Sequence, residues 1–272
     1  MHLEQAFGVS QRRACRAVGQ HRTTQRWPSP VATCQEERLR RQLRRLAREQ
    51  PRWGYQRVWG RLRLDGWPVN RKRVQRLWRD EGLRVPAAPP KRSRVGTSTA
   101  GSERLSAQHP NQVWALDFLF DTTADGRPFK VLSMCDEFTR ESVSGKVARS
   151  ITADDVVVIL DSAAGQRGVP KFIRCDNGPE FIAAAIRDWC RFSGAGAAYI
   201  DPGSPWQNPF VESFNSRARD ELFAREIFHS SMEARVLYAD WRHTYHTYRP
   251  HSALNWLPPA QYASQWSGAT IQ

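Results

Sequence analysis

The sequence has no long apolar run and few cysteines, and each of these absences excludes a class of protein. Its longest aliphatic stretch is 156–160, which is far too short to span a bilayer. The five cysteines are scattered and form no C-x-x-C pair, so neither a disulfide framework nor a four-cysteine zinc site is expected. The first residues form no basic-then-apolar secretory segment. We therefore expect a cytoplasmic protein with no membrane partner.

Acidic residues are scarce in one part of the chain. Residues 1–110 contain 25 Lys and Arg but only 8 Asp and Glu, a net charge of +17, whereas residues 111–272 contain 16 and 19, a net charge of −3. A small domain usually carries a net charge of about 2–8 in magnitude, so a merely solubilising surface explains +17 poorly. A basic segment of this kind typically neutralises phosphates. We expect residues 1–110 to bind nucleic acid.

The basic half has the periodicity of short helices. Apolar stripes and capping residues predict helices at 11–18, 22–27, 36–50, 54–64 and 70–81. The first two surround a glycine and resemble a short helix-turn-helix, which gives a first segment at 1–30. The other three predict a helix-turn-helix DNA-binding domain at 31–85.

The helix at 70–81 is the expected recognition helix. Asn70 caps it, Gly82 ends it, and its apolar stripe leaves basic faces toward solvent. These side chains either read base edges in a major groove or contact phosphates alone, and base contact is the preferred hypothesis. The residues expected to bind DNA are Arg71, Lys72, Arg73, Gln75, Arg76 and Arg79.

A basic linker rich in proline and serine, at 86–109, leads to a segment of different character. There, strands are predicted at 112–120, 129–135, 142–148, 171–175 and 197–200. Helices are predicted at 152–166, opened by a capping box at Thr152, and at 180–192 and 208–225. Three strands followed by alternating helices and strands indicate a mixed α/β fold over 110–228. A helical extension at 229–272 follows.

Three acidic residues are the candidate catalytic residues. Asp117 lies mid-strand, where an unpaired carboxylate is costly and requires a cation or a hydrogen-bond network. Asp176 follows the fourth strand, at the edge where sites form in α/β sheets, although Asp-Asn-Gly is also an ordinary turn. Glu212 lies on the last helix of this segment, away from its core stripe, and taken alone is an ordinary exposed glutamate.

Together these carboxylates form a set of hard oxygen ligands that suits Mg²⁺ or Mn²⁺. A paired-metal site stabilises the attacking and leaving oxygens of an in-line phosphoryl transfer. A polyanion-binding half joined to such a site indicates phosphodiester chemistry on nucleic acid. The histidine-rich stretch at 243–251 has no cysteine or acidic partner nearby, so stacking and backbone hydrogen bonds are expected there rather than zinc.

At this point the sequence resembles a known family. With 35 residues between Asp176 and Glu212, the three carboxylates are similar to the DDE triad of retroviral integrases and related transposases. The surrounding motifs are WALDF (114–118), DEFTRE (136–141), RCDNGPEF (174–181), PGSPWQN (202–208), VESFNSR (211–217) and YRPHSAL (248–254). These motifs resemble those of the OrfB-type transposases of bacterial insertion sequences, whose transposase is made by frameshifting.

The resemblance implies an RNase H-like integrase core, with a mixed five-stranded sheet and helices, after an all-α helix-turn-helix region. It implies that Asp117, Asp176 and Glu212 bind two Mg²⁺ ions, which Mn²⁺ can replace. It also implies that Arg219, seven residues after the glutamate, contacts DNA, and we expect Asn177 and Trp206 to do so as well.

The expected function is that of a DNA transposase, a polynucleotidyl transferase that cleaves and joins insertion-sequence ends. The alternatives are a catalytically silent DNA-binding regulator derived from a transposase, and a nuclease without joining activity. Expected partners are double-stranded DNA of the transposon ends and target, further copies of the chain assembled on DNA, and a protein from an upstream reading frame fused by frameshift. The expected location is the bacterial cytoplasm, in association with the nucleoid.

Overall fold

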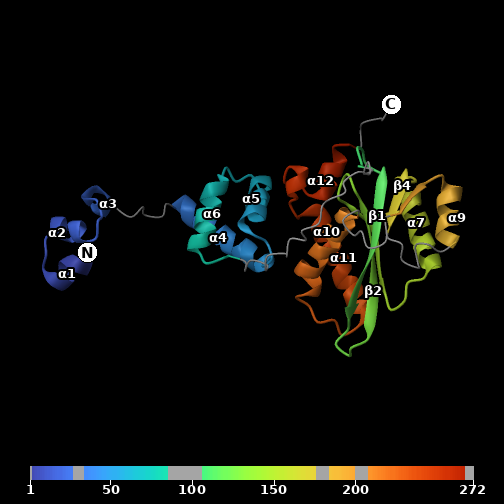
Figure 1. Cartoon of the computed structure of the whole chain (residues 1–272), viewed down its shortest axis with the longest axis horizontal. Coiled ribbons are helices and arrows are strands. Elements are labelled where there is room, and N and C mark those ends of the chain that lie inside the picture. Colours follow the sequence, from blue (N-terminus) through green and yellow to red (C-terminus); the bar gives the residue numbers. More distant parts are fainter. Residues whose placement is uncertain (1, 27–33, 85–105, 176–183, 200–207, 267–272) are drawn as a thin grey trace, which may run out of the picture. The chain divides into compact units, whose positions relative to one another are not determined.

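The computed structural model describes residues 2–26, 34–84, 106–175, 184–199 and 208–266 (Figure 1). The chain divides into two compact units, Met1–Arg45 and Leu46–Gln272. None of the described helices is long and apolar enough to cross a membrane. The predicted linker at 86–109 lies almost entirely outside the described residues, and the predicted five-part division of the chain stays a prediction.

The first unit is built from short helices. It contains α1 (His2–Phe7), α2 (Gln11–Ala17), α3 (Arg22–Arg26) and most of α4 (Cys34–Glu49). Ser10 precedes α2 at the predicted capping position, but its side chain accepts no cap hydrogen bond. Gly19 ends the α2 turn with a φ of +66°, a conformation that glycine adopts at little cost.

The predicted recognition helix forms within the second unit. Helix α5 (Tyr55–Leu64) is followed by α6 (Arg71–Asp80), and the Asn70 side chain accepts a hydrogen bond of 2.8 Å from Lys72 N at the start of α6. The α6 stripe of Val74, Leu77 and Trp78 is buried, as its spacing predicts. Trp59 Nε1 donates to Val69 O at 3.0 Å, which fixes the turn between the two helices.

The second unit also contains a five-stranded mixed sheet, as the sequence predicts. Its strands are β1 (Val113–Thr122), β2 (Pro128–Asp136), β3 (Ser142–Ala148), β4 (Phe172–Cys175) and β5 (Gly196–Tyr199). Their order is β3-β2-β1-β4-β5, with β1 antiparallel to β2 and parallel to β4. The long strand β1 is therefore central.

Helices cover both faces of this sheet (Figure 1). One core contains Trp114 and Leu116 of β1 together with residues of α7 (Ala153–Arg167) and α9 (Ala184–Ser193). The other contains Ala115 and Leu119 together with α10 (Pro209–Ala218) and α11 (Ser231–Thr247). The alternation along β1 thus assigns each side chain to one layer. The predicted capping box between Thr152 and Asp155 is present at the start of α7.

One helix prediction is wrong. The helix predicted at 208–225 is interrupted after Ala218 by a π-helical turn, η2 (Arg219–Phe223). Glu221, Leu222 and Phe223 are consecutive and all buried, and the wider turn accommodates this burial, which one stripe of a regular α-helix does not provide. The chain ends its described part with η3 (Ser252–Leu254) and α12 (Pro259–Ser264).

Candidate active site

Asp117 lies in the middle of β1 and faces α10. Its neighbours two residues away, Ala115 and Leu119, belong to the core layer that α10 and α11 form, so the alternation places Asp117 on that face. Its carboxylate is half-buried and accepts a hydrogen bond at Oδ1 from Phe118 N (2.8 Å) and another at Oδ2 from Asn215 Nδ2 (2.9 Å). A hydrogen-bond network of the kind expected for a carboxylate on this strand is therefore present.

Helix α10 is anchored beside Asp117 by its own sequence. Pro209 occupies the first turn, and Asn208 Nδ2 donates to Leu116 O at 3.0 Å, one residue before Asp117 on β1. Val211 and Phe214 are buried in the layer between the helix and the sheet. These contacts fix both the axial position and the rotation of α10.

The rotation of α10 also determines the side of the helix on which Glu212 lies. Residues three apart on an α-helix share a face, so half-buried Glu212 lies on the same side of α10 as Asn215, whose amide contacts Asp117. Two of the three candidate carboxylates are thus brought to one junction of strand and helix. Asp176, Asn177 and Trp206 lie outside the described residues.

The site contains a residue that sequence reasoning missed. Asn215 is buried between Phe214 and the next core residue of the stripe, Ala218, where an apolar side chain would be the default. A polar residue on the buried side of an amphipathic helix, three residues after a candidate ligand, is a signal that could have identified it.

Other acidic residues of the core have structural roles. Asp136 accepts hydrogen bonds from Asn111 N, Phe138 N and Thr139 N at 2.6–2.9 Å, and its burial raises the pKa of its carboxyl. Buried Glu137 binds Arg174 at 2.5 Å. The DEFTRE motif therefore builds a turn after β2.

Among the residues that the structure describes, no group of three or more His, Cys, Asp or Glu could hold a metal ion. Two of the three histidines of 243–251 make contacts of the expected kinds: His246 Nε2 accepts from Ser142 N at 2.7 Å, and His251 packs edge-on against Tyr245, while His243 is exposed. The acceptor role of His246 requires a neutral ring, and burial lowers its pKa to about 4.

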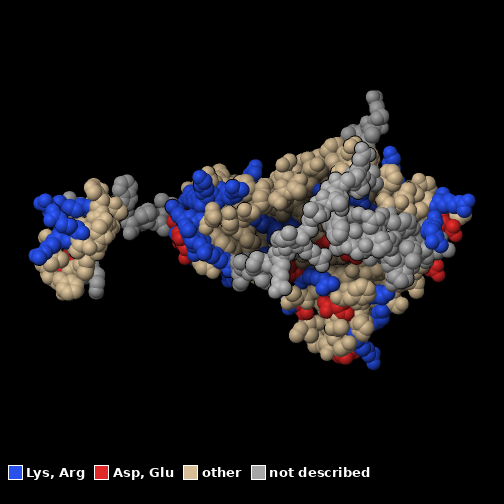
Figure 2. Space-filling view, viewed as in Figure 1, with Lys and Arg blue, Asp and Glu red and all other residues tan. Residues whose placement is uncertain are grey.

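The candidate DNA-binding side chains of α6 point away from its core. Arg71, Lys72, Gln75, Arg76 and Arg79 are exposed and Arg73 is half-buried. Figure 2 shows Lys and Arg side chains gathered over the helices that precede the sheet. Arg219 is exposed at the end of α10.

Three domain models of known families match the chain. An integrase core domain model matches residues 107–205, a second integrase core domain model matches 193–259, and an HTH-like domain model matches 35–92. A protein of insertion element IS407 from Burkholderia multivorans is 37% identical, over 97% of this chain and 94% of its own length. The transposase InsD of insertion element IS2 from Escherichia coli is 30% identical, over 80% of this chain and 75% of its own length.

The chain belongs to the transposase family of insertion elements. A further family member, from insertion element IS476 of Xanthomonas euvesicatoria, is 40% identical over 95% of this chain and 73% of its own length. The family's integrase-type fold is also seen in a chain of the simian T-cell lymphotropic virus intasome. That chain matches with a TM-score of 0.51 and 14% identity, over 78% of this chain and 73% of its own length. The resemblance and the fold class predicted from the sequence are confirmed.

Proposed function

We propose that this transposase cleaves DNA at the ends of its insertion element and joins them to a target. Asp117, Asp176 and Glu212 are the proposed ligands of two Mg²⁺ ions, which Mn²⁺ can replace. The observation that carries the proposal is the hydrogen bond between Asn215 and Asp117, because it brings the strand of one carboxylate and the helix of another to one place.

The chemistry of the described donors fits a hard divalent cation. Carboxylate oxygens are the ligands that Mg²⁺ prefers, and Asp117 is half-buried beside an amide that orients it. When bound, such ions stabilise the attacking and leaving oxygens of an in-line displacement at phosphorus. The Asn215 amide and the Phe118 N–H hold the Asp117 carboxylate in one orientation before any ion binds.

The proposed reaction has two steps. In the first, water attacks a phosphodiester at the element end, a P–O bond forms, the P–O3′ bond breaks, and a 3′-hydroxyl is released. In the second, that hydroxyl attacks a phosphodiester of the target, forming a new P–O bond and breaking another. Each attacking oxygen loses its proton to solvent and each leaving oxygen gains one.

DNA recognition is assigned to the basic surfaces. The α6 side chains are proposed to read the element ends, and Arg219, Asn177 and Trp206 to contact DNA near the reacting phosphodiester. The exposure of the α6 side chains and of Arg219 supports this division. We also propose that two or more copies assemble on paired ends, with an upstream-frame protein as a further partner. A cytoplasmic, nucleoid-associated location is part of the same proposal.

The test compares Asp117→Asn with Asp121→Asn, which removes one charge from the same strand. Strand transfer of labelled end oligonucleotides is measured with Mg²⁺ and with EDTA. We expect Asp117→Asn to bind DNA and to lose cleavage and joining, whereas Asp121→Asn keeps both. Metal-dependent joining by Asp117→Asn would overturn the assignment, and wild-type protein that binds ends without any cleavage would favour the regulator.

A further inference from the structure

A pocket of about 570 Å³ lies in the second unit, on a side of α10 different from the one that carries Glu212. Its walls come from the first turn of α5, the turn after β2, α10 and the segment after α11. Four arginines line it, and none of the described residues that line it is acidic. The arginines are Arg57, Arg140, Arg217 and Arg249.

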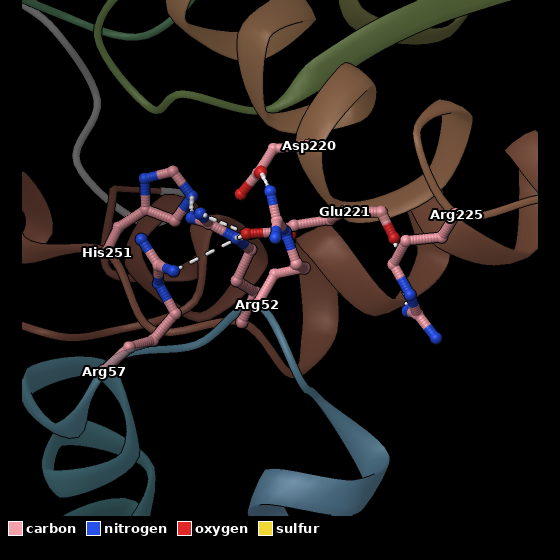
Figure 3. Close-up of polar contacts among 7 residues, drawn as sticks. Arg52, Arg57, Asp220, Glu221, Arg225 and His251 are labelled. Atoms are coloured by element: carbon pink, nitrogen blue, oxygen red, sulfur yellow. Dashed lines mark hydrogen bonds and ion pairs between the residues drawn. The ribbon is translucent and has the colours of Figure 1, made fainter. Parts of the chain in front are cut away.

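One carboxylate next to the pocket, that of Glu221, forms ion pairs with two of these arginines (Figure 3). Arg249 Nε lies 3.0 and 2.9 Å from the two oxygens of Glu221 and its Nη2 lies 2.7 Å from Oε1, while Arg57 Nη1 lies 3.5 Å from Oε1. Asp220, the neighbour of Glu221, pairs with Arg52 instead. The pocket therefore has an excess of positive charge.

The other described residues that line the pocket carry no negative charge, and the two carboxylates that interact with Arg140, Glu137 and Asp136, lie outside the lining. Burial, and then Arg249 and the other arginines, lower the pKa of His251 to about 2, so this ring is neutral and accepts at Nε2 from Arg249 Nη1 (3.1 Å). Burial and Arg249 also lower the pKa of Arg57, a sign of crowded like charges. An arginine remains charged near neutral pH even so.

The pocket also has more hydrogen-bond donors than the described acceptors satisfy. Arg57 Nε and Arg140 Nη1 are buried without a hydrogen-bond partner among the described residues. The Arg140 guanidinium is held in place by the Phe210 ring, whose centroid lies 3.7 Å from Cζ. The N-terminus of α5 adds to the rim, because Gly54 caps it without a side-chain hydrogen bond. Helix N-termini favour anions.

We propose that this pocket binds a phosphate group of the DNA backbone. Planar guanidiniums that outnumber carboxylates, with spare donors, match the oxygens of a phosphodiester. Exposed Arg217 stands at the mouth, where a long polymer can reach it. Because α10 carries both Glu212 and this wall, a strand bound here passes close to the proposed active site, so the inference rests on the proposed function.

The test uses the full chain in EDTA, where no cleavage occurs, and measures DNA affinity over a range of salt concentrations. Arg217→Gln is the main variant, because Arg217 is exposed and its removal leaves the Glu221 pairs intact. Ser213→Asp, which adds an anion to the same wall of α10, is the second variant. Arg191→Gln, an exposed arginine of α9, is the matched control for loss of one charge.

Loss of one phosphate contact should reduce the slope of log K against log[salt] by roughly 0.9 in magnitude. We expect this change, with roughly tenfold weaker binding at low salt, for Arg217→Gln and Ser213→Asp but not for Arg191→Gln. Equal slopes in all four proteins would overturn the proposal.

A second arm separates DNA from free phosphate. Inorganic phosphate at millimolar concentration is added and the melting temperature is measured for wild type and Arg217→Gln. Stabilisation of wild type alone, with unchanged DNA slopes, would assign the pocket to free phosphate and refute the DNA assignment. If strand transfer is absent from wild type while the slopes differ as expected, the proposed function is wrong but the proposal that the pocket binds a DNA phosphate is supported.

Discussion

Asn215 of α10 donates a hydrogen bond of 2.9 Å from its Nδ2 to Oδ2 of Asp117, in the middle of β1. The two residues are far apart in the sequence, and this contact connects the helix that carries Glu212 to the strand that carries Asp117. It also helps to orient a carboxylate that is only half-buried.

Asn215→Ala should therefore weaken catalysis through Asp117. Loss of a residue that orients a metal ligand typically costs about 10–100-fold in metal affinity or activity. We expect strand transfer to fall by that amount and half-maximal activity to require more Mg²⁺, with DNA affinity unchanged. Ser216→Ala, an exposed change on the same helix, is the control. A drop in activity with no shift of the Mg²⁺ requirement would show that Asn215 only stabilises the fold.

The packing of α5 on the segment after α11 can be tested with one glycine. A Cβ at Gly60 would lie 2.8 Å from Trp256 Cε3 and 3.2 Å from Pro250 Cβ, so Gly60→Ala should overpack this contact and destabilise the chain by about 1–3 kcal/mol. Gly165 in α7 meets nothing within 4 Å, and Gly165→Ala should stabilise the chain by about 0.5–1 kcal/mol. Urea unfolding measures both. Similar effects of the two substitutions would contradict the close approach.

Stability should depend on pH through two half-buried histidines. Burial lowers the folded-state pKa of His246 to about 4 and of His251 to about 2, whereas an unfolded histidine titrates near about 6.5. Between pH 6.5 and 4 the unfolded chain binds protons that the folded chain does not, so the free energy of unfolding falls as the pH falls. The stabilisation is fully present above pH 6.5.

His246→Asn isolates one of these titrations, because asparagine can still accept the hydrogen bond from Ser142 N. Denaturant unfolding between pH 4 and 7 should show a pH slope smaller by about one proton. An unchanged slope in His246→Asn would mean that this ring is charged in the folded chain.

Two substitutions on the exposed face of α6 should affect DNA binding in different ways. If Gln75 reads a base, Gln75→Ala should cost about 1–3 kcal/mol on element-end DNA and little on unrelated DNA, with an unchanged salt slope. If Arg79 contacts a phosphate, Arg79→Gln should weaken both and reduce the slope by about one. Arg187→Gln on α9 controls for the lost charge. If both α6 variants weaken binding to both DNAs alike, this helix contacts phosphates and reads no base.

Most of the fold could be predicted from local patterns, because caps and periodicity act within a few residues. The capping box of α7, the Asn70 cap of α6 and the five strands are where the sequence predicts them. The π-helical turn could not be predicted, since it depends on where Glu221 and Phe223 find partners in other elements. Glu221 binds Arg249, and Phe223 packs against Phe129 and Phe228.

The candidate site was predictable in part. Asp117 stands out because a carboxylate in a buried strand is costly, but Glu212 alone is an ordinary helical glutamate, and only its companions single it out. Asn215 escaped notice because the position of an amide within a helix does not reveal which carboxylate it will meet. The structure describes Asp117 and Glu212 but not Asp176, and the catalytic roles of all three stay proposals.

The sequence by itself determined the charge division of the chain, the positions of most of its helices and the face on which Asp117 lies, because each depends on composition or on short-range periodicity. Only the tertiary structure decided that Asn215 meets Asp117, and that arginines from four separate segments surround one pocket. Periodicity determines which side of an element is buried. Which elements then face one another depends on the packing of the whole core, and that packing placed Arg57, Arg140, Arg217 and Arg249 around one pocket, with a single carboxylate, Glu221, paired with Arg57 and Arg249.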